Sequence, residues 1–306
     1  MNEVIFKAGQ RIGEAVASID GRLLALYDRR KLYVLDLEAG RLRHEEETPG
    51  FDTFRFDRPG RRLYVADGFD LAVLALPALQ WVELPGLKGF KDLVATYFYD
   101  SKADGEALIW HRDETAHASQ WPPPGALYRL DAEGRSCARI GPCPLFPSGR
   151  YLDPARGLAV FWSEVRLHAV VDLEGRDARP KLPDLAMEPG LVLGVGIDGA
   201  YAVEAGGTLV IRDPRGTERS RCPFPSGIVG HEVALSPDLR LLAGKAEGAP
   251  RVRLFDATTG RETAAVEPGD GAWPSILLFV PRGKGARLLA ACDDGTVRAI
   301  HEVKGP

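Results

Sequence analysis

Short apolar runs separated by Gly, Pro and Asp recur along the whole chain. Each run has the length of an ordinary β-strand, and segments with an apolar period of 3.6 residues are hard to find, so we expect little helix. The Gly and Pro residues stand between the runs, which indicates many turns. The clearest predicted strands are Arg22–Tyr27, Lys31–Leu37, Arg61–Ala66, Leu71–Leu76, Gly157–Ser163, Leu167–Leu173, Thr208–Arg212 and Arg251–Asp256.

The predicted strands repeat along the chain. Several of them end at an aspartate, and these aspartates are Asp36, Asp131, Asp172, Asp213 and Asp256. The last four are spaced by 41, 41 and 43 residues. The gap of 95 between the first two holds one further unit and an insertion of about a dozen residues, and a last unit follows 45 residues after the fifth aspartate. Seven units of four strands each are typical of a β-propeller, so we predict an all-β, seven-bladed β-propeller with antiparallel blades.

The two ends of the chain fit one closed ring. Too few residues follow Thr296–Glu302 for a fourth strand, and Glu3–Lys7 is a strand with no blade of its own. We therefore expect the N-terminal strand to complete the last blade, with Val4 and Phe6 buried on it. This arrangement makes residues 1–306 a single domain, with an insertion in the third blade at about 113–125.

One unit resembles a known repeat. The sixth unit reads GHEVALSPDLRLLAGKAEGAPRVRLFDATTGRE and is similar to a WD40 repeat. Gly230-His231 opens it, Ser236-Pro237-Asp238 forms its first turn, and Leu254-Phe255-Asp256 stands where a Trp-Asp pair would be. The other units carry fainter versions of the pattern. The resemblance implies a degenerate WD40-like propeller, which agrees with the repeat period.

Composition and charge limit the expected partners and the expected cellular location of the protein. The net charge is −4, whereas proteins that bind nucleic acid usually carry a basic excess, so we expect no nucleic-acid partner. No apolar run is long enough for a membrane helix and no secretory signal is visible, and four cysteines make no disulfide framework. We expect a cytoplasmic protein without membrane contact, and the predominance of Arg over Lys indicates a GC-rich bacterial genome.

The candidate binding residues lie in predicted loops. The longest irregular stretch, DETAHASQWPPPG at 113–125, carries Trp121, and the predicted links between blades carry further aromatic residues. The WD40 resemblance implies that this insertion, the links and the Arg29-Arg30 turn share one face. Trp and Arg are enriched in binding hot spots, so these residues are candidates for a protein-binding surface. The alternative is that the aromatic residues fill the junctions between blades. The candidates are Trp121, Arg29, Arg30, Trp273 and Phe90.

Catalytic and metal-binding patterns are weak. The sequence contains neither a Gly-x-Ser-x-Gly nucleophile elbow nor a phosphate-binding loop. His111 and its acidic neighbours match no metal motif, and the cysteines have no zinc-knuckle spacing. The predicted inner strands are mostly apolar, with a few acids at the expected channel mouth: Asp52, Asp57, Asp92 and Glu232. We therefore predict no cofactor and no metal.

These observations favour a non-enzymatic interaction module of a bacterial multi-protein system that binds a protein through its loop-rich face. Fold alone does not determine function, so the prediction depends partly on analogy. The WD40-like resemblance suggests MoxR-type ATPases or von Willebrand factor A domain proteins as partners. Two alternatives stay open: a propeller enzyme, such as a lactonase-like hydrolase with a metal in the channel, and a sensor that binds a small ligand at the channel mouth.

Overall fold

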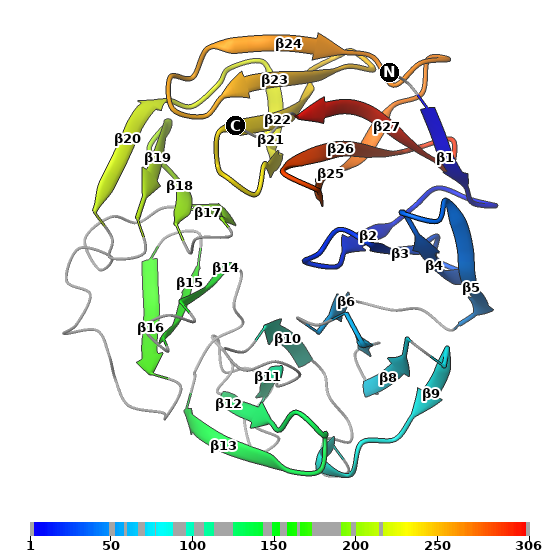
Figure 1. Cartoon of the computed structure of the whole chain (residues 1–306). Coiled ribbons are helices and arrows are strands. Elements are labelled where there is room, and N and C mark those ends of the chain that lie inside the picture. The colour runs from blue at the N-terminus through cyan, green and yellow to red at the C-terminus, as the bar shows by residue number, and fades with distance from the viewer. Residues whose placement is uncertain are drawn as a thin grey trace. The chain divides into compact units, whose positions relative to one another are not determined.

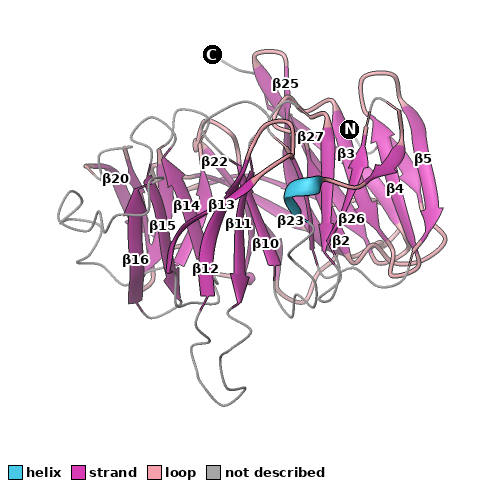
Figure 2. Ribbon diagram, turned by 90° about the horizontal axis from the view of Figure 1, so that it is seen from below, coloured by secondary structure: helices cyan, strands magenta, loops and turns pink. Residues whose placement is uncertain are grey.

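The structure is a computed structural model of the 306-residue chain. The residues that it describes are 3–48, 53–57, 60–66, 71–76, 78–87, 96–100, 107–112, 125–142, 149–153, 158–163, 166–172, 191–196, 200–213 and 217–303. These segments are strands joined by turns, with one short 3-10 helix (Figure 2). They group into two compact units, one formed by residues 1–49 and 192–306 and the other by residues 50–191.

The first unit contains four sheets of four strands each (Figure 1). In three of them neighbouring strands follow one another in the sequence, and the fourth includes the N-terminal strand β1. The first sheet consists of β2 (Glu14–Ala17), β3 (Leu23–Tyr27), β4 (Lys31–Asp36) and β5 (Arg41–Glu47). The second consists of β17 (Leu191–Val195), β18 (Tyr201–Ala205), β19 (Thr208–Arg212) and β20 (Glu218–Pro223). The third consists of β21 (Ile228–Leu235), β22 (Leu241–Ala246), β23 (Val252–Asp256) and β24 (Glu262–Val266). In the fourth, β25 (Pro274–Arg282), β26 (Gly285–Cys292) and β27 (Thr296–Val303) are completed by β1 (Glu3–Lys7).

The second unit contains three sheets of the same kind. The first consists of β6 (Thr53–Phe56), β7 (Arg62–Ala66), β8 (Leu71–Ala75) and β9 (Gln80–Val82), followed by the helix η1 (Pro85–Leu87). The second consists of β10 (Thr96–Asp100), β11 (Ala107–Arg112), β12 (Gly125–Leu130) and β13 (Cys137–Pro142). The third consists of β14 (Gly149–Asp153), β15 (Leu158–Ser163) and β16 (Arg166–Asp172) in the described part of the chain. Tyr64, Val73, Ile109 and Leu130 form a buried core between the first two of these sheets.

The predicted strands agree closely with the observed ones. Thr208–Arg212 and Glu3–Lys7 coincide with β19 and β1, and the other predicted strands match observed strands within one residue at each end. The predicted insertion, residues 113–125, falls between β11 and β12, but nearly all of it lies outside the described residues.

The recurring aspartates have a common structural role. Each of the four below ends or follows the third strand of its sheet, and a carboxylate oxygen accepts a hydrogen bond from a backbone N–H two to five residues later. Such a carboxylate supplies the hydrogen-bond acceptor for backbone N–H groups that have no backbone partner in a tight turn. The repeat period therefore reflects one turn in successive sheets. These residues are Asp36, Asp131, Asp213 and Asp256.

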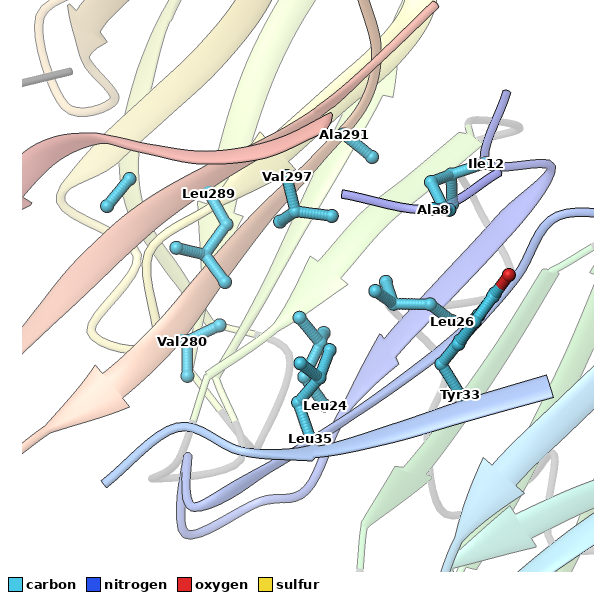
Figure 3. Close-up of a cluster of buried hydrophobic side chains, with 11 residues drawn as sticks. Ala8, Ile12, Leu24, Leu26, Tyr33, Leu35, Val280, Leu289, Ala291 and Val297 are labelled. Carbon is cyan, nitrogen blue, oxygen red and sulfur yellow. The ribbon is translucent and has the colours of Figure 1, made fainter. Parts of the chain in front are cut away.

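Buried side chains join neighbouring sheets of the first unit. Figure 3 shows Leu24, Leu26 and Leu35 of the first sheet packed with Val280 and Leu289 of the sheet formed by β25–β27 and β1. Two further clusters join β17–β20 to β21–β24, and β21–β24 to β25–β27. At the starts of the sheets, β21 contacts β25, and β25 contacts β2. The first strands β21, β25 and β2 therefore lie next to one another in this unit.

The N-terminal strand β1 pairs antiparallel with β27, and the pairing contains a bulge between Val4 and Phe6. Ile5 and Phe6 both pack against the buried cluster, and the Phe6 ring meets the Tyr33 ring edge-on with centroids 5.0 Å apart. The expectation that Val4 is buried is wrong, because Val4 is 48% exposed. An extra residue in a bulge breaks the two-residue alternation of a strand, so neighbouring side chains can reach the same face.

Candidate functional site

The connections between sheets and the turns between second and third strands lie at the same end of each sheet in the first unit. Strands that alternate in direction require this, because the chain returns to its starting end after two strands and again after four. Backbone hydrogen bonds link the two kinds of segment. Ala8 N–H donates to the Gly295 carbonyl (2.9 Å), Phe224 N–H to Gly207 (2.8 Å), and Glu247 N–H to Gly227 (3.2 Å). We call this end of the first unit the loop face; it comprises residues 8–13, 28–30, 206–207, 224–227, 247–251, 267–273 and 293–295.

Trp273 differs from the other residues of the loop face. It is 45% exposed, although both its backbone N–H and its carbonyl are hydrogen-bonded. Its N–H donates to Asp293 Oδ1 (2.9 Å), and its carbonyl accepts the Asp293 N–H (3.0 Å). The preceding residue, Ala272, is buried between sheets. The backbone of Trp273 is thus fixed while a large part of the residue meets solvent, which is the arrangement that limits the entropy lost on binding.

A buried arginine holds the connection before Trp273. Arg298 is 5% exposed, and its guanidinium donates to the Pro268 carbonyl (3.1 Å) and to Asp270 Oδ2 (3.0 Å). It also donates to Asp294 Oδ2 (3.3 Å) and to Thr296 Oγ1 (2.9 Å). Burial opposes ionisation of Asp294, but hydrogen bonds from Thr296 lower its pKa, so the carboxylate stays charged beside Arg298.

The Arg29-Arg30 turn is built on a buried aspartate. Asp28 is 2% exposed, and its carboxylate accepts the N–H groups of Arg30 (3.0 Å) and Lys31 (2.8 Å). It also accepts the Tyr33 hydroxyl (2.8 Å). Burial and this hydrogen bond raise the pKa of Tyr33 to about 12. Arg29 has a φ of 73°, and both arginines are exposed, so the turn presents two guanidinium groups from a rigid base.

A charged cluster lies where β21, β22 and β25 meet the loop face. Lys245 forms an ion pair with Glu232 and donates to the Ser275 carbonyl (3.2 Å). Burial, and secondly the charge of Arg11, lowers the pKa of Lys245. Glu232 lies in an irregular stretch of β21, since the pairing with β22 shifts between Ile228 and Val233. The charge of Arg11 therefore acts on Lys245, whose ammonium group is bonded to Ser275 near the start of β25.

The predicted site residues have different outcomes. Trp121 and Phe90 lie outside the described residues. Trp273, Arg29 and Arg30 are exposed on the loop face. Trp273 is largely exposed, whereas Phe224, an aromatic residue of the connection before β21, packs against the core between two sheets. Asp57, one of the acids predicted at the channel mouth, is buried and caps the turn between β6 and β7 by accepting the N–H groups of Arg61 (2.7 Å) and Arg62 (2.9 Å).

Arg298 and Arg11 were missed as contributors to the site. The sequence does carry a signal for Arg298, since it is the one charged residue in the stretch Thr296–Ile300 of a predicted strand, and a charge that is buried there needs charged or polar partners. Arg11 carries no comparable signal, because its position depends on the packing of three sheets. Among the described residues, no group of three or more His, Cys, Asp and Glu side chains could hold a metal ion. Within the same residues, none of the helices has the length and apolarity needed to cross a membrane.

Comparisons with known proteins bear on the fold. Neither a family model nor a curated protein matches the chain. The β-propeller domain of Cps50 (Swd1) from Myceliophteria thermophila matches over 99% of this chain and 100% of its own, with a TM-score of 0.65 and 12% identity. Hydrazine synthase from Kuenenia stuttgartiensis matches over 99% of both chains, with a TM-score of 0.64 and 14% identity. KlHsv2 with loop 6CD replaced by a Gly-Ser linker covers 97% of this chain and 98% of its own, with a TM-score of 0.58 and 11% identity.

These likenesses concern the fold, because the identities are low. They agree with the repeated four-stranded antiparallel sheets, with the contacts between first strands, and with the repeat pattern of the sequence. The chain therefore has a WD40-like β-propeller fold.

Proposed function

We propose that this protein is a non-enzymatic interaction module that binds a protein partner through its loop face. The observation that carries the proposal is the exposed Trp273, whose backbone is held by Asp293 and whose connection is held by Arg298. Large aromatic residues on rigid supports are the usual anchors of protein interfaces. Arg29 and Arg30, which are exposed on the same loop face, add two positive charges to the proposed binding surface.

The proposal includes the form of the whole chain. The sheets are the blades of a seven-bladed ring, and β1 closes the ring by completing the last blade. This form supports the function because a closed ring holds the connections and turns rigidly at one face. Trp121 and Phe90, which lie outside the described residues, stay candidates for partner binding.

The partner class that the resemblance suggests is a MoxR-type ATPase or a von Willebrand factor A domain protein. The test is capture of partners from a lysate of the native host on the immobilised protein, followed by mixing with the purified candidate. Trp273→Ala is expected to weaken capture about thirtyfold, as for an anchor worth at least ~2 kcal/mol, while melting stays nearly unchanged. Trp81→Ala is the matched control, since Trp81 is also exposed, at 36%, but lies on the outer strand β9. Equal capture by the wild type and Trp273→Ala would refute the role of Trp273.

The competing function is a metal-dependent hydrolase with its site in the channel. Metal analysis of the protein purified without chelators separates the two. A stoichiometric divalent ion would favour the enzyme, and its absence together with Trp273-dependent capture would favour the interaction module.

A further inference from the structure

The connection before β25 contains a tight turn that leads into Trp273. The Ala272 N–H donates to the Gly269 carbonyl (3.1 Å), and the two residues between them, Asp270 and Gly271, have φ values of 53° and 70°. Positive φ at both central positions is typical of a type I′ turn, in which Asp-Gly and Asn-Gly are favoured. Asp270 and Gly271 are exposed, whereas Ala272 is buried. The turn is therefore well formed locally, and its exposed part lies just before the proposed anchor.

An ion pair joins the exposed part of this turn to the sheet. Arg298 Nη1 donates to Asp270 Oδ2 (3.0 Å), and the same nitrogen donates to the Pro268 carbonyl (3.1 Å). The side chain of Arg298 is 6% exposed, but that of Asp270 is 83% exposed. Charge on both partners strengthens a hydrogen bond, yet a carboxylate in contact with water is open to screening by salt. The arginine is thus the fixed half of the pair, and the aspartate is the accessible half.

Arg298 keeps other partners when Asp270 is released. Its guanidinium also donates to Asp294 Oδ2 (3.3 Å) and to Thr296 Oγ1 (2.9 Å), which belong to the turn and the strand around Arg298 itself. A buried charge that loses its partner is strongly destabilising, but a charge that keeps a carboxylate and a hydroxyl is not left in this state. The turn can therefore separate from the arginine without unfolding of the sheet.

The preceding sheet holds its own connection from the same position of the repeat. Arg253 lies 45 residues before Arg298, on the third strand β23, and its guanidinium donates to the Ser226 carbonyl (2.6 Å) in the connection before β21. The carboxylate that pairs with Arg253 is that of Glu262 on β24, so it belongs to the sheet. At Arg298, in contrast, the accessible carboxylate comes from the connection. The attachment of the connection before Trp273 therefore depends on a charge that the connection itself carries.

We propose that Asp270 and Arg298 form a latch that positions Trp273 on the loop face and that opens when the charge of Asp270 is removed or screened. This inference rests on the proposed role of Trp273 as an anchor and adds a positioning residue, Asp270, to it. With the latch closed, the turn and the hydrogen bond from the Trp273 N–H to Asp293 hold the anchor in one orientation. With the latch open, residues 269–273 gain conformational freedom, which the anchor must lose again when it binds.

Hydrogen exchange at the Ala272 and Trp273 amides tests the latch without any partner. Asp270→Asn removes the charge but keeps a residue that favours this turn, so a change in exchange reports the ion pair rather than the turn. We expect the protection factors of both amides to fall about fivefold in Asp270→Asn and about tenfold in Asp270→Gly, which also removes the acceptor atom. The melting temperature should stay within about 2 °C of the wild type. Unchanged protection in both variants would overturn the proposal.

Salt provides a second measurement on the same amides. Raising the NaCl concentration from about 0.05 M to about 0.5 M shortens the distance over which charges act, so it should lower the protection factors of the wild type about threefold. In Asp270→Asn the same change should have less than about a twofold effect, because the ion pair is already absent. A salt effect of equal size in both proteins would contradict a latch that depends on charge.

Glu267→Gln is the matched control, because it removes one negative charge from the same connection. The Glu267 carboxylate pairs with Arg251 (2.8 Å), outside the turn. Protection at the Ala272 and Trp273 amides should stay within about twofold of the wild type in this variant. An equal loss of protection in Glu267→Gln would assign the effect to the total charge of the connection and overturn the role of Asp270.

Capture of the host partner shows whether the latch acts through Trp273. Asp270→Gly should weaken capture about fivefold in the wild-type background. In the Trp273→Ala background it should cause no further loss, since the side chain to be positioned is then absent. A further fivefold loss in that background would mean that Asp270 contacts the partner directly, and it would overturn the positioning role.

The latch and the proposed function can fail separately. Unchanged protection in the Asp270 variants, together with capture that depends on Trp273, would refute the latch and leave the interaction function intact. Lowered protection in these variants, together with capture that is insensitive to Trp273→Ala, would support the latch and refute the role of Trp273 as an anchor.

Discussion

Aspartate side chains at the turns make the stability of this protein depend on their ionisation. The Ala39 N–H lowers the pKa of Asp36, the Ser136 hydroxyl lowers that of Asp131, and the Thr258 hydroxyl lowers that of Asp256. In each case a hydrogen bond donated to the carboxylate favours its charged form in the folded protein. A group whose pKa is lower in the folded state stabilises the fold above its unfolded pKa, and this contribution is lost as the pH falls.

We therefore expect the melting temperature to fall steeply as the pH is lowered from about 4.5 to about 3, around and below the unfolded pKa of aspartate. Asp256→Asn keeps an acceptor for Thr258 but cannot ionise. It should lower stability at neutral pH by about 1 kcal/mol or less and should reduce the loss between these pH values. Thermal unfolding of both proteins across this pH range measures the effect. Parallel pH curves for the two proteins would contradict the role of Asp256.

Sheets of the first unit approach each other closely at particular turns. Gly21, in the turn between β2 and β3, has a φ of 71°, and a Cβ added there would lie 2.0 Å from the carbonyl oxygen of Pro281 on β25. The contact is between two backbones, so no flexible side chain can move aside. Only glycine allows the turn to meet the neighbouring sheet at this distance.

Gly21→Ala is expected to destabilise the protein by roughly 2–4 kcal/mol, from the unfavourable φ and from the separation of two packed elements. Gly40→Ala is the matched control, because Gly40 has a φ of 61° but open space around the added Cβ. It should cost only about 1 kcal/mol, from the backbone conformation alone. Denaturant unfolding of both variants gives the comparison, and similar losses would show that the approach to Pro281 contributes nothing.

The proposed ring depends on one strand from the beginning of the chain. β1 covers the edge of β27 and adds Ile5 and Phe6 to the cluster shared by the first and last sheets. Without it, that edge and the Tyr33 ring would meet water. Pairing between segments so far apart in sequence makes the ring one cooperative body in this proposal.

Deletion of residues 1–7 should lower the free energy of unfolding by roughly 2–4 kcal/mol, less than for two fully buried side chains because Ile5 and Phe6 are half-buried. That is a large share of the ~5–15 kcal/mol typical of a folded protein. Calorimetry of the truncated protein is the measurement. Val4→Ala provides the control and should stay within about 0.5 kcal/mol of the wild type, since Val4 is largely exposed. A truncated protein that melts like the full chain would refute closure by β1.

Strand positions and the repeat could be predicted because they depend on local properties. Alternation of apolar runs with turn residues places a strand without reference to its partners, and an aspartate caps its own turn from a few residues away. For this reason the predicted strands match β3, β4 and β19 within a residue, and the aspartate spacing corresponds to a repeated turn. The WD40-like fold follows from the same local signals repeated along the chain.

Exposure of the site residues could not be predicted, because it depends on contacts between distant segments. Phe224 and Trp273 both lie in links beside a proline, yet Phe224 packs between two sheets and Trp273 is exposed. Around Trp273, Asp293 bonds the Trp273 backbone and Arg298 bonds the preceding connection at Pro268, both from a distant part of the same sheet. Val4 shows the same limit, since a bulge in the pairing with β27 changes which side chains face the core. Local pattern determines where strands form, whereas long-range pairing determines which of their side chains meet solvent.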